Sequence, residues 1–204
     1  MVVPDTTYTA RFRVLGSQLT AGGKYDMPVT LSIQMGVGDN RQPFGLIDNP
    51  LTGNVNDDQN PREYIVPEIC KAAEWFTVHA QSWQFTLHNA DPLLRSSWKA
   101  HMSMTSNSDE PYVLALRDGD AVPSIPPYMN QRDISDILRD YIDPIDNRIR
   151  LFEDEIIYLF ELGVTDLNSP AADFQDLVVL VTLAEDHIYF ENPRARIRPT
   201  VAFD

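Results

Sequence analysis

The segment Val29-Thr-Leu-Ser-Ile-Gln-Met35 alternates hydrophobic and polar side chains without interruption. Residues two apart on a β-strand point to the same side of a sheet, so Val29, Leu31, Ile33 and Met35 are expected to share one buried face. Val and Ile are also β-branched, which favours strands. This stretch therefore predicts a strand that lies with one face against a hydrophobic core.

Segments with the same period recur along the chain. Turns rich in Gly, Pro, Asn and Asp separate them, and there is no alternation of strands with helices. The 204 residues fit one β-sandwich domain that spans 1–204. We predict a mainly β fold, an antiparallel two-sheet sandwich that is jelly-roll-like, with strands at 8–14, 29–35, 75–79, 83–88, 98–104, 112–116, 148–152, 156–162 and 177–183 and a last extended segment at 188–197.

One segment has the period of a helix instead. Within 130–142, hydrophobic side chains follow the i, i+3, i+4, i+7 spacing of one helix face: Ile134, Ile137, Leu138 and Tyr141. Asp133 is a favourable N-cap residue, and Asp143-Pro144 ends the pattern. We predict one short helix near 130–142.

Residues 36–61 are rich in Gly, Asn, Asp and Pro and have neither period. They predict a long irregular loop. Long loops without secondary structure are uncommon in compact domains and are often functional, so this loop is a candidate docking surface.

The formal net charge is -14. Nucleic-acid binding needs a basic face, so no nucleic-acid partner is expected for this acidic protein. Asp outnumbers Glu, and Lys is rare. Three explanations can coexist: Asp side chains bond the backbone in turns, they ligate calcium, or an acidic surface keeps the protein soluble in a high-salt habitat.

No stretch approaches the ~18 consecutive apolar residues of a membrane-spanning helix, so an integral membrane protein is not expected. The first ten residues, MVVPDTTYTA, lack the basic region and apolar run of a signal peptide. The sequence is therefore read either as the mature form of a secreted protein or as a cytoplasmic protein.

The segment 159–181 carries the most informative local pattern. A strand ending in Phe-Glu leads through an Asp-containing loop to Asp-Phe-Gln-Asp-Leu-Val-Val. It resembles the C-terminal part of a bacterial family of domains of unknown function, number 4114, through Phe160, Glu161, Asp173, Phe174, Asp176, Leu177, Val178 and Val179. Gln175 stands where that family usually has Asn, and Leu162 where it usually has Asp. The resemblance implies a β-sandwich module of secreted or cell-surface bacterial proteins without assigned catalysis.

The same hairpin is a candidate metal site. Four carboxylates and one amide fall within it: Glu161, Asp166, Asn168, Asp173 and Asp176. Repulsion among the carboxylates favours a calcium ion among them, although the spacing is not that of an EF-hand. The alternative is that Asp173 and Asp176 bond loop amides and bind no metal.

Arginines occupy alternate positions in three segments. Arg11 and Arg13 form the first pair and Arg148 and Arg150 the second, and the third group is Arg194, Arg196 and Arg198. If the three strands were neighbours, they would form a basic stripe, and the third group is our candidate interface with an acidic partner or a second copy. The alternative is a solvated face balanced by acidic residues on adjacent strands.

Other chemistry is weakly indicated. Trp75, Trp83 and Trp98 form either a sugar-stacking platform or part of the core. His79 and His88 are read as strand-end residues rather than metal ligands, and the lone Cys70 as a buried thiol. No G-x-S-x-G, P-loop, G-x-G-x-x-G or H-E-x-x-H motif occurs, so we expect no catalytic activity.

These observations favour a non-catalytic structural or adhesion β-sandwich of the bacterial cell surface or exterior, stabilised by calcium and self-associating. The first alternative is an accessory subunit of a larger complex or particle. The second is a carbohydrate-binding module. An enzyme is the least favoured class.

Overall fold

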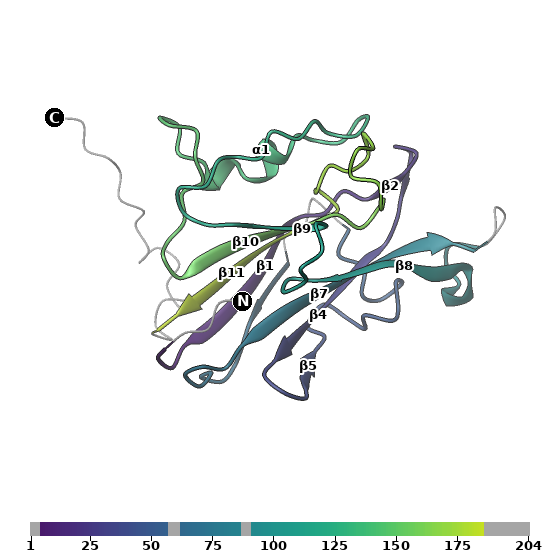
Figure 1. The fold of residues 1–204 in the computed structure, drawn as a ribbon. Coiled ribbons are helices and arrows are strands. Elements are labelled where there is room, and N and C mark those ends of the chain that lie inside the picture. Colours follow the sequence, from purple (N-terminus) through teal and green to yellow (C-terminus); the bar gives the residue numbers. More distant parts are fainter. Residues whose placement is uncertain (1–4, 57–61, 87–90, 186–204) are drawn as a thin grey trace.

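The computed structural model describes residues 5–56, 62–86 and 91–185. Two antiparallel sheets face each other, and a short two-stranded hairpin and a long covering segment lie beside them (Figure 1). The prediction of a mainly β, antiparallel two-sheet sandwich with one short helix is confirmed.

The first sheet has five strands, and its centre pairs segments from opposite ends of the chain. β1 and β11 run antiparallel, with Phe12 opposite Val181, and β11 in turn pairs with β10. The strands lie in the order β6 (Arg62–Ile65), β1 (Thr9–Gly16), β11 (Leu177–Ala184), β10 (Glu155–Phe160) and β9 (Val113–Leu116).

The second sheet has four strands and contains the strand predicted at 29–35. It follows the order β5 (Asp39–Arg41), β4 (Val29–Met35), β7 (Phe76–Phe85) and β8 (Trp98–Thr105). A separate small hairpin joins β2 (Thr20–Ala21) to β3 (Tyr25–Asp26).

The main core lies between the sheets. Alternate residues of β4 and β1 point into it, and each is at most 2% exposed, among them Leu31, Ile33, Met35, Phe12 and Val14. Phe12 also packs edge-on against Phe76 of the opposite sheet, with ring centroids 5.4 Å apart. The alternating hydrophobic residues of β1 and β4 are therefore buried between the sheets, as the sequence predicts.

A second core covers the outer face of the first sheet. The chain between β9 and β10 crosses this face and carries α1 (Ile134–Ile137) (Figure 1). It packs Ile134, Leu138 and Ile149 against Ile157 and Val178 of the sheet. Every residue of β10 and β11 is consequently buried. These two strands are hydrophobic on both faces because both faces are covered.

The predicted helix is shorter than 130–142. Asp133 caps it as expected, since its side chain accepts a hydrogen bond from Ser135 N, 2.8 Å away. After α1, the chain tightens into the 3₁₀ turn η2 (Arg139–Tyr141). Only the hydrophobic stripe Ile134, Leu138 and Tyr141 is buried, so packing on the sheet, rather than a long helix, holds this segment.

Two strand predictions were wrong in detail. Residues 148–152 do not join a sheet, because this segment crosses the sheet face and forms only isolated bridges, one of them between Ile149 and Ile142. The segments 75–79 and 83–88 were predicted as separate strands, but β7 joins 76–79 and 83–85 in one strand with an irregularity between Gln81 and Trp83, and residues 87–88 lie outside the described residues.

The predicted irregular loop at 36–61 contains a short strand. β5 pairs with β4, and turns follow it as far as residue 56, while 57–61 lie outside the described residues. The other short helical element of the described chain is the 3₁₀ turn η1 (Arg95–Ser97), which leads into β8.

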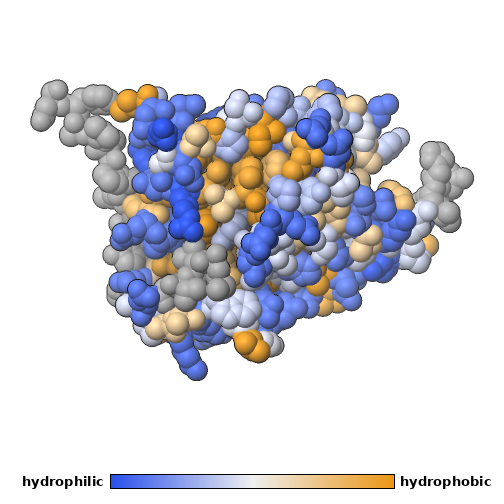
Figure 2. Space-filling view, in the orientation of Figure 1, coloured by the Kyte–Doolittle hydropathy of each residue, from blue (hydrophilic) through white to orange (hydrophobic). Residues whose placement is uncertain are grey.

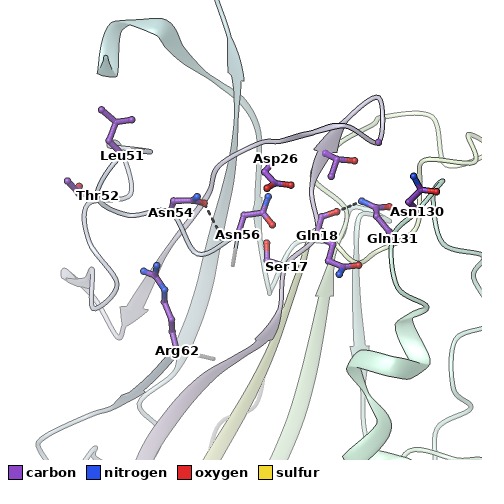
Figure 3. A pocket seen from close by; sticks show the side chains of 12 residues that line it. Ser17, Gln18, Asp26, Leu51, Thr52, Asn54, Asn56, Arg62, Asn130 and Gln131 are labelled. Carbon is purple, nitrogen blue, oxygen red and sulfur yellow. Dashed lines mark hydrogen bonds between the residues drawn. The ribbon is translucent and has the colours of Figure 1, made fainter. Parts of the chain in front are cut away.

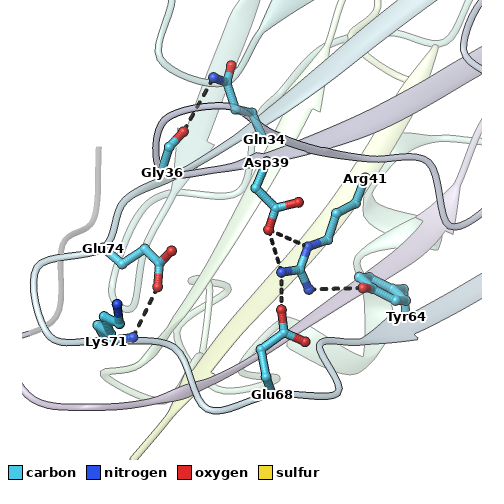
Figure 4. Close-up of polar contacts among 8 residues, drawn as sticks. All are labelled: Gln34, Gly36, Asp39, Arg41, Tyr64, Glu68, Lys71 and Glu74. Carbon is cyan, nitrogen blue, oxygen red and sulfur yellow. Dashed lines mark hydrogen bonds and ion pairs between the residues drawn. The ribbon is translucent and has the colours of Figure 1, made fainter.

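Arg41 joins the edges of the two sheets (Figure 4). It lies on β5 and donates to Asp39 at 2.5 and 3.0 Å, to the Tyr64 hydroxyl of β6 at 3.2 Å, and to Glu68. The hydrogen bond from Arg41 lowers the pKa of Asp39. Because β5 and β6 belong to different sheets, this cluster holds the sandwich together at one edge.

The molecular surface in the view of Figure 2 is mostly hydrophilic. Hydrophobic residues are visible mainly between the segment that carries α1 and the sheet beneath it. In the part of the chain that the structure describes, no helix is long and apolar enough to cross a membrane.

Candidate functional site: a buried carboxylate hairpin

The β10–β11 hairpin brings two acidic side chains face to face. Phe160 opposes Leu177 in the last pair of the ladder, so the next positions, Glu161 and Asp176, oppose each other. Glu161 is 0% exposed and Asp176 is 2% exposed. Asp173 lies in the loop between them, three residues before Asp176, and is also buried. The sequence therefore places three carboxylates in the interior at the end of one hairpin.

Backbone N–H groups of the hairpin and its neighbours point at these carboxylates. Asp176 Oδ2 accepts from Leu162 N at 2.6 Å. Glu161 Oε1 accepts from Gly163 N and Val164 N, at 2.9 and 3.0 Å. These bonds satisfy the amides of the tight turn that follows β10, which strand pairing leaves unpaired.

Asp173 ties the hairpin to the covering segment. Its Oδ1 accepts from Gln175 N at 3.2 Å, and its Oδ2 accepts from Tyr128 N at 3.1 Å. Burial raises the pKa of Asp173 to about 6, and the negative charge of Glu161 acts in the same direction, while the backbone hydrogen bonds oppose it.

Asp176 is the most perturbed of the three acids. Burial, followed by the charge of Glu161, raises its pKa well above the ordinary value. A buried pair of carboxylates avoids repulsion when one of them holds a proton. Among the described residues, none of the three acids forms an ion pair with Lys or Arg.

The structure brings together only part of the predicted metal-ligand set. Glu161, Asp173 and Asp176 form the cluster, whereas Asp166 and Asn168 are exposed. Asp166 Oδ1 instead accepts from the backbone N of Asn168 at 3.0 Å, which is an Asx turn. Proximity in sequence was misleading here because the loop carries these two side chains outward.

The geometry also bears on the choice between calcium and backbone capping. No group of three His, Cys, Asp or Glu side chains within residues 5–56, 62–86 and 91–185 is arranged to hold a metal ion. The backbone hydrogen bonds of Asp173 and Asp176 are those of the capping alternative. Calcium binding stays a prediction.

Several residues that hold the hairpin were not predicted. Ser17 donates to Asp176 O at 2.5 Å, and Ser82, at the irregularity of β7, donates to Leu162 O at 2.7 Å. His101 bonds Gly163 O at 3.0 Å. Ser17 directly follows β1, and Ser82 and His101 lie on β7 and β8, so all three are distant in sequence and no local pattern could have indicated them. Gln175 is also buried, and its amide atoms have no partner in the described chain.

The arginine pairs that can be placed do not form a stripe. Arg11 pairs with Glu63 of the adjacent strand at 3.7 Å, which matches the balanced-face alternative. Arg150 pairs with Asp143 at 3.7 Å in the covering segment rather than on a strand. Arg194, Arg196 and Arg198 lie outside the described residues.

The structure contradicts the sugar-stacking platform and places two of the three tryptophans in the interior. Trp83 is 2% exposed and donates to Thr30 Oγ1 at 3.0 Å, and Trp98 is 6% exposed and donates to Pro92 O at 3.0 Å. Trp75 is half-buried. With the other two tryptophans in the interior, the three rings cannot form an exposed surface on which a sugar could stack.

Cys70 is buried, and burial raises the pKa of its thiol to about 11. It therefore stays protonated at neutral pH, unlike a reactive cysteine. His79 has a pKa lowered by burial and lies 2.6 Å from Ser103 Oγ, whereas His88 falls outside the described residues.

The fold and the site together define a class: an antiparallel β-sandwich whose C-terminal hairpin encloses carboxylates. The chain matches no protein-family model, no curated protein and no solved structure. The resemblance of residues 159–181 to the family of domains numbered 4114 therefore stays a prediction.

Proposed function

We propose that this protein is a non-catalytic structural module of the bacterial cell surface or exterior, acting in adhesion or assembly. The observation that carries the proposal is the burial of Glu161, Asp173 and Asp176 in a hairpin whose backbone they cap. Catalytic carboxylates must reach a substrate, but these three are at most 2% exposed. Their chemistry supports a role in stability.

A calcium-stabilised form of the same module is the second candidate. The facing carboxylates of Glu161 and Asp176, without an ion pair to a basic side chain in the described chain, favour it. A cation bound there would replace the proton that otherwise relieves their repulsion.

Thermal unfolding in calcium and in EDTA tests the calcium candidate. A ligand that binds only the folded state stabilises it by ~2.7 kcal/mol at a hundred times its dissociation constant. The calcium form predicts a higher midpoint in calcium for wild type and no calcium response for Asp173→Ala. Equal midpoints in both conditions for wild type would reject calcium and leave the capping role.

Self-association tests the structural role itself. Arg196→Glu reverses a charge in the predicted interface and changes none of the described residues. An interface built on these arginines should weaken in high salt and in this variant. Sedimentation velocity at low and high salt measures both effects. Wild type that is monomeric in every condition and retains no partner would contradict assembly through this segment.

A further inference from the structure

A polar cavity of about 680 Å³ adjoins the carboxylate hairpin at Ser17, whose hydroxyl donates to Asp176 O (Figure 3). Its wall is formed by the end of β1 with the β2–β3 hairpin, by residues 51–56 and by Asn130 and Gln131. The volume falls within the ~300–1,000 Å³ of small-molecule sites. Amide and hydroxyl side chains make up most of the lining. Among the described lining residues, Leu51 is the one large hydrophobic side chain.

Two asparagines in this wall have fixed orientations. Asn54 Oδ1 accepts from Val29 N at 3.0 Å and from Asn56 N at 2.9 Å. Asn56 Nδ2 donates to Leu19 O at 2.8 Å and to Met27 O at 2.6 Å. These backbone partners assign the oxygen and nitrogen of both amides. Asn54 Nδ2 is therefore left as a donor and Asn56 Oδ1 as an acceptor, and neither has a partner within the described chain.

Two further oxygens at the wall lack partners. Gln131 donates its Nε2 to Gln18 O, and its Oε1 is buried without a hydrogen bond to any described residue. Thr20 Oγ1 is likewise buried and has no hydrogen bond to a described residue. Buried polar atoms are nearly always satisfied, so such atoms at a cavity wall indicate an ordered water or a polar ligand group.

Among the lining residues that the structure describes, one side chain is acidic and one is basic. Asp26 is exposed and Arg62 half-buried, and neither forms an ion pair or side-chain hydrogen bond with a described residue. One carboxylate is too few for a calcium site, and one guanidinium beside a carboxylate is a poor anion site. The lining thus favours a neutral ligand.

We infer that this cavity binds a neutral, hydroxyl-rich ligand, namely one or two units of a saccharide. Each hydroxyl is both a donor and an acceptor, and it fits beside a fixed donor such as Asn54 Nδ2 and a fixed acceptor such as Asn56 Oδ1. Asp26 and Arg62 supply stronger hydrogen bonds at the rim. The scarcity of apolar lining disfavours peptide side chains as the occupants. This inference is independent of the proposed structural role.

The test is saturation-transfer difference NMR of the whole chain with glucose, galactose, mannose and N-acetylglucosamine, each at about 10 mM, ten times a weak Kd of ~1 mM. At least one sugar should show saturation transfer. Asn54→Asp keeps the oxygen that caps Val29 N and Asn56 N but removes the Nδ2 donor. It should weaken that sugar's binding about tenfold, which corresponds to ~1.4 kcal/mol.

The matched control is Asn49→Asp. Asn49 lies in the same loop, where its Oδ1 caps Leu51 N, but it is not among the described lining residues. Asn49→Asp makes the same chemical change as Asn54→Asp, and this variant should bind the sugar as wild type does. Thermal melts of both variants check that they are folded. The blocked dipeptide N-acetyl-alanyl-alanine N-methylamide serves as the peptide probe. The inference is overturned if no sugar binds, if only the dipeptide binds, or if both variants bind alike.

Discussion

Glu161 and Asp176 lie opposite each other at the end of the β10–β11 ladder, one position beyond the pair Phe160 and Leu177, and both carboxylates are buried. Like charges at opposed strand positions are destabilising even when exposed. Here burial and the charge of Glu161 raise the pKa of Asp176 well above its ordinary value, so the folded state binds a proton at this pair more readily than the unfolded chain does. The hairpin therefore ties the stability of the sandwich to pH.

The first prediction is that mild acid stabilises this protein. The pKa of Asp173 rises from 3.8 to about 6 on folding, so the folded state binds a proton more tightly than the unfolded chain. The resulting contribution is complete below pH 3.8 and is lost as the pH rises through 6. The two pKa values correspond to up to ~3 kcal/mol. Urea unfolding at about pH 5 and about pH 7.5 should give the higher free energy of unfolding at the lower pH. A higher free energy of unfolding at pH ~7.5 than at pH ~5 would contradict the raised pKa of Asp173.

The second prediction is that Asp176→Asn stabilises the protein at neutral pH. Asn can accept from Leu162 N as Asp176 does, and its Nδ2 can donate to Glu161 without requiring a proton from solvent. The free energy of unfolding should rise, and its pH dependence should flatten, because the raised pKa of Asp176 no longer contributes. Asp118→Asn is the control, because Asp118 caps Leu151 N at the exposed end of a turn and should change little. A fall in stability seen only in calcium would support the calcium form instead.

The third prediction concerns the cluster in Figure 4. Arg41→Met removes the hydrogen bonds to Asp39, Tyr64 and Glu68 that connect the sheet edges, and we expect a loss of ~1–2 kcal/mol. Arg139→Met is the control, since Arg139 forms only an exposed pair with Asp136 in the same short segment and should matter by less than ~0.5 kcal/mol. Chemical denaturation of both variants makes the comparison, and equal losses would mean that Arg41 does not join the sheets.

The fourth prediction tests the covering segment. Leu138→Ala removes a side chain that is 0% exposed in the second core and should cost ~2–5 kcal/mol. Leu93→Ala is the matched control, because Leu93 is 79% exposed and its truncation should be nearly neutral. If the two variants unfold at the same denaturant concentration, the segment does not contribute to a cooperative fold.

Local alternation was sufficient for the strands whose two faces have different surroundings. The prediction at 29–35 coincides with β4, and Asp133 caps α1 as predicted, because period and capping depend on neighbours in sequence. The segment 148–152 has the same local period but forms no sheet strand. Its Ile149 and Leu151 instead pack on the outer face of the sheet, and this position depends on residues far away in the chain.

In the acidic site, too, some features follow from the local sequence and others from the tertiary structure. Composition and spacing indicated that carboxylates gather near the C-terminal hairpin, and three of the predicted residues do so. Strand register, however, decides that Glu161 faces Asp176, and the path of the loop turns Asp166 and Asn168 outward. Burial then raises the pKa of Asp176, which no sequence pattern records. The polar cavity depends even more on tertiary structure, because Ser17, Asn54 and Gln131 become neighbours only when three separate segments pack together.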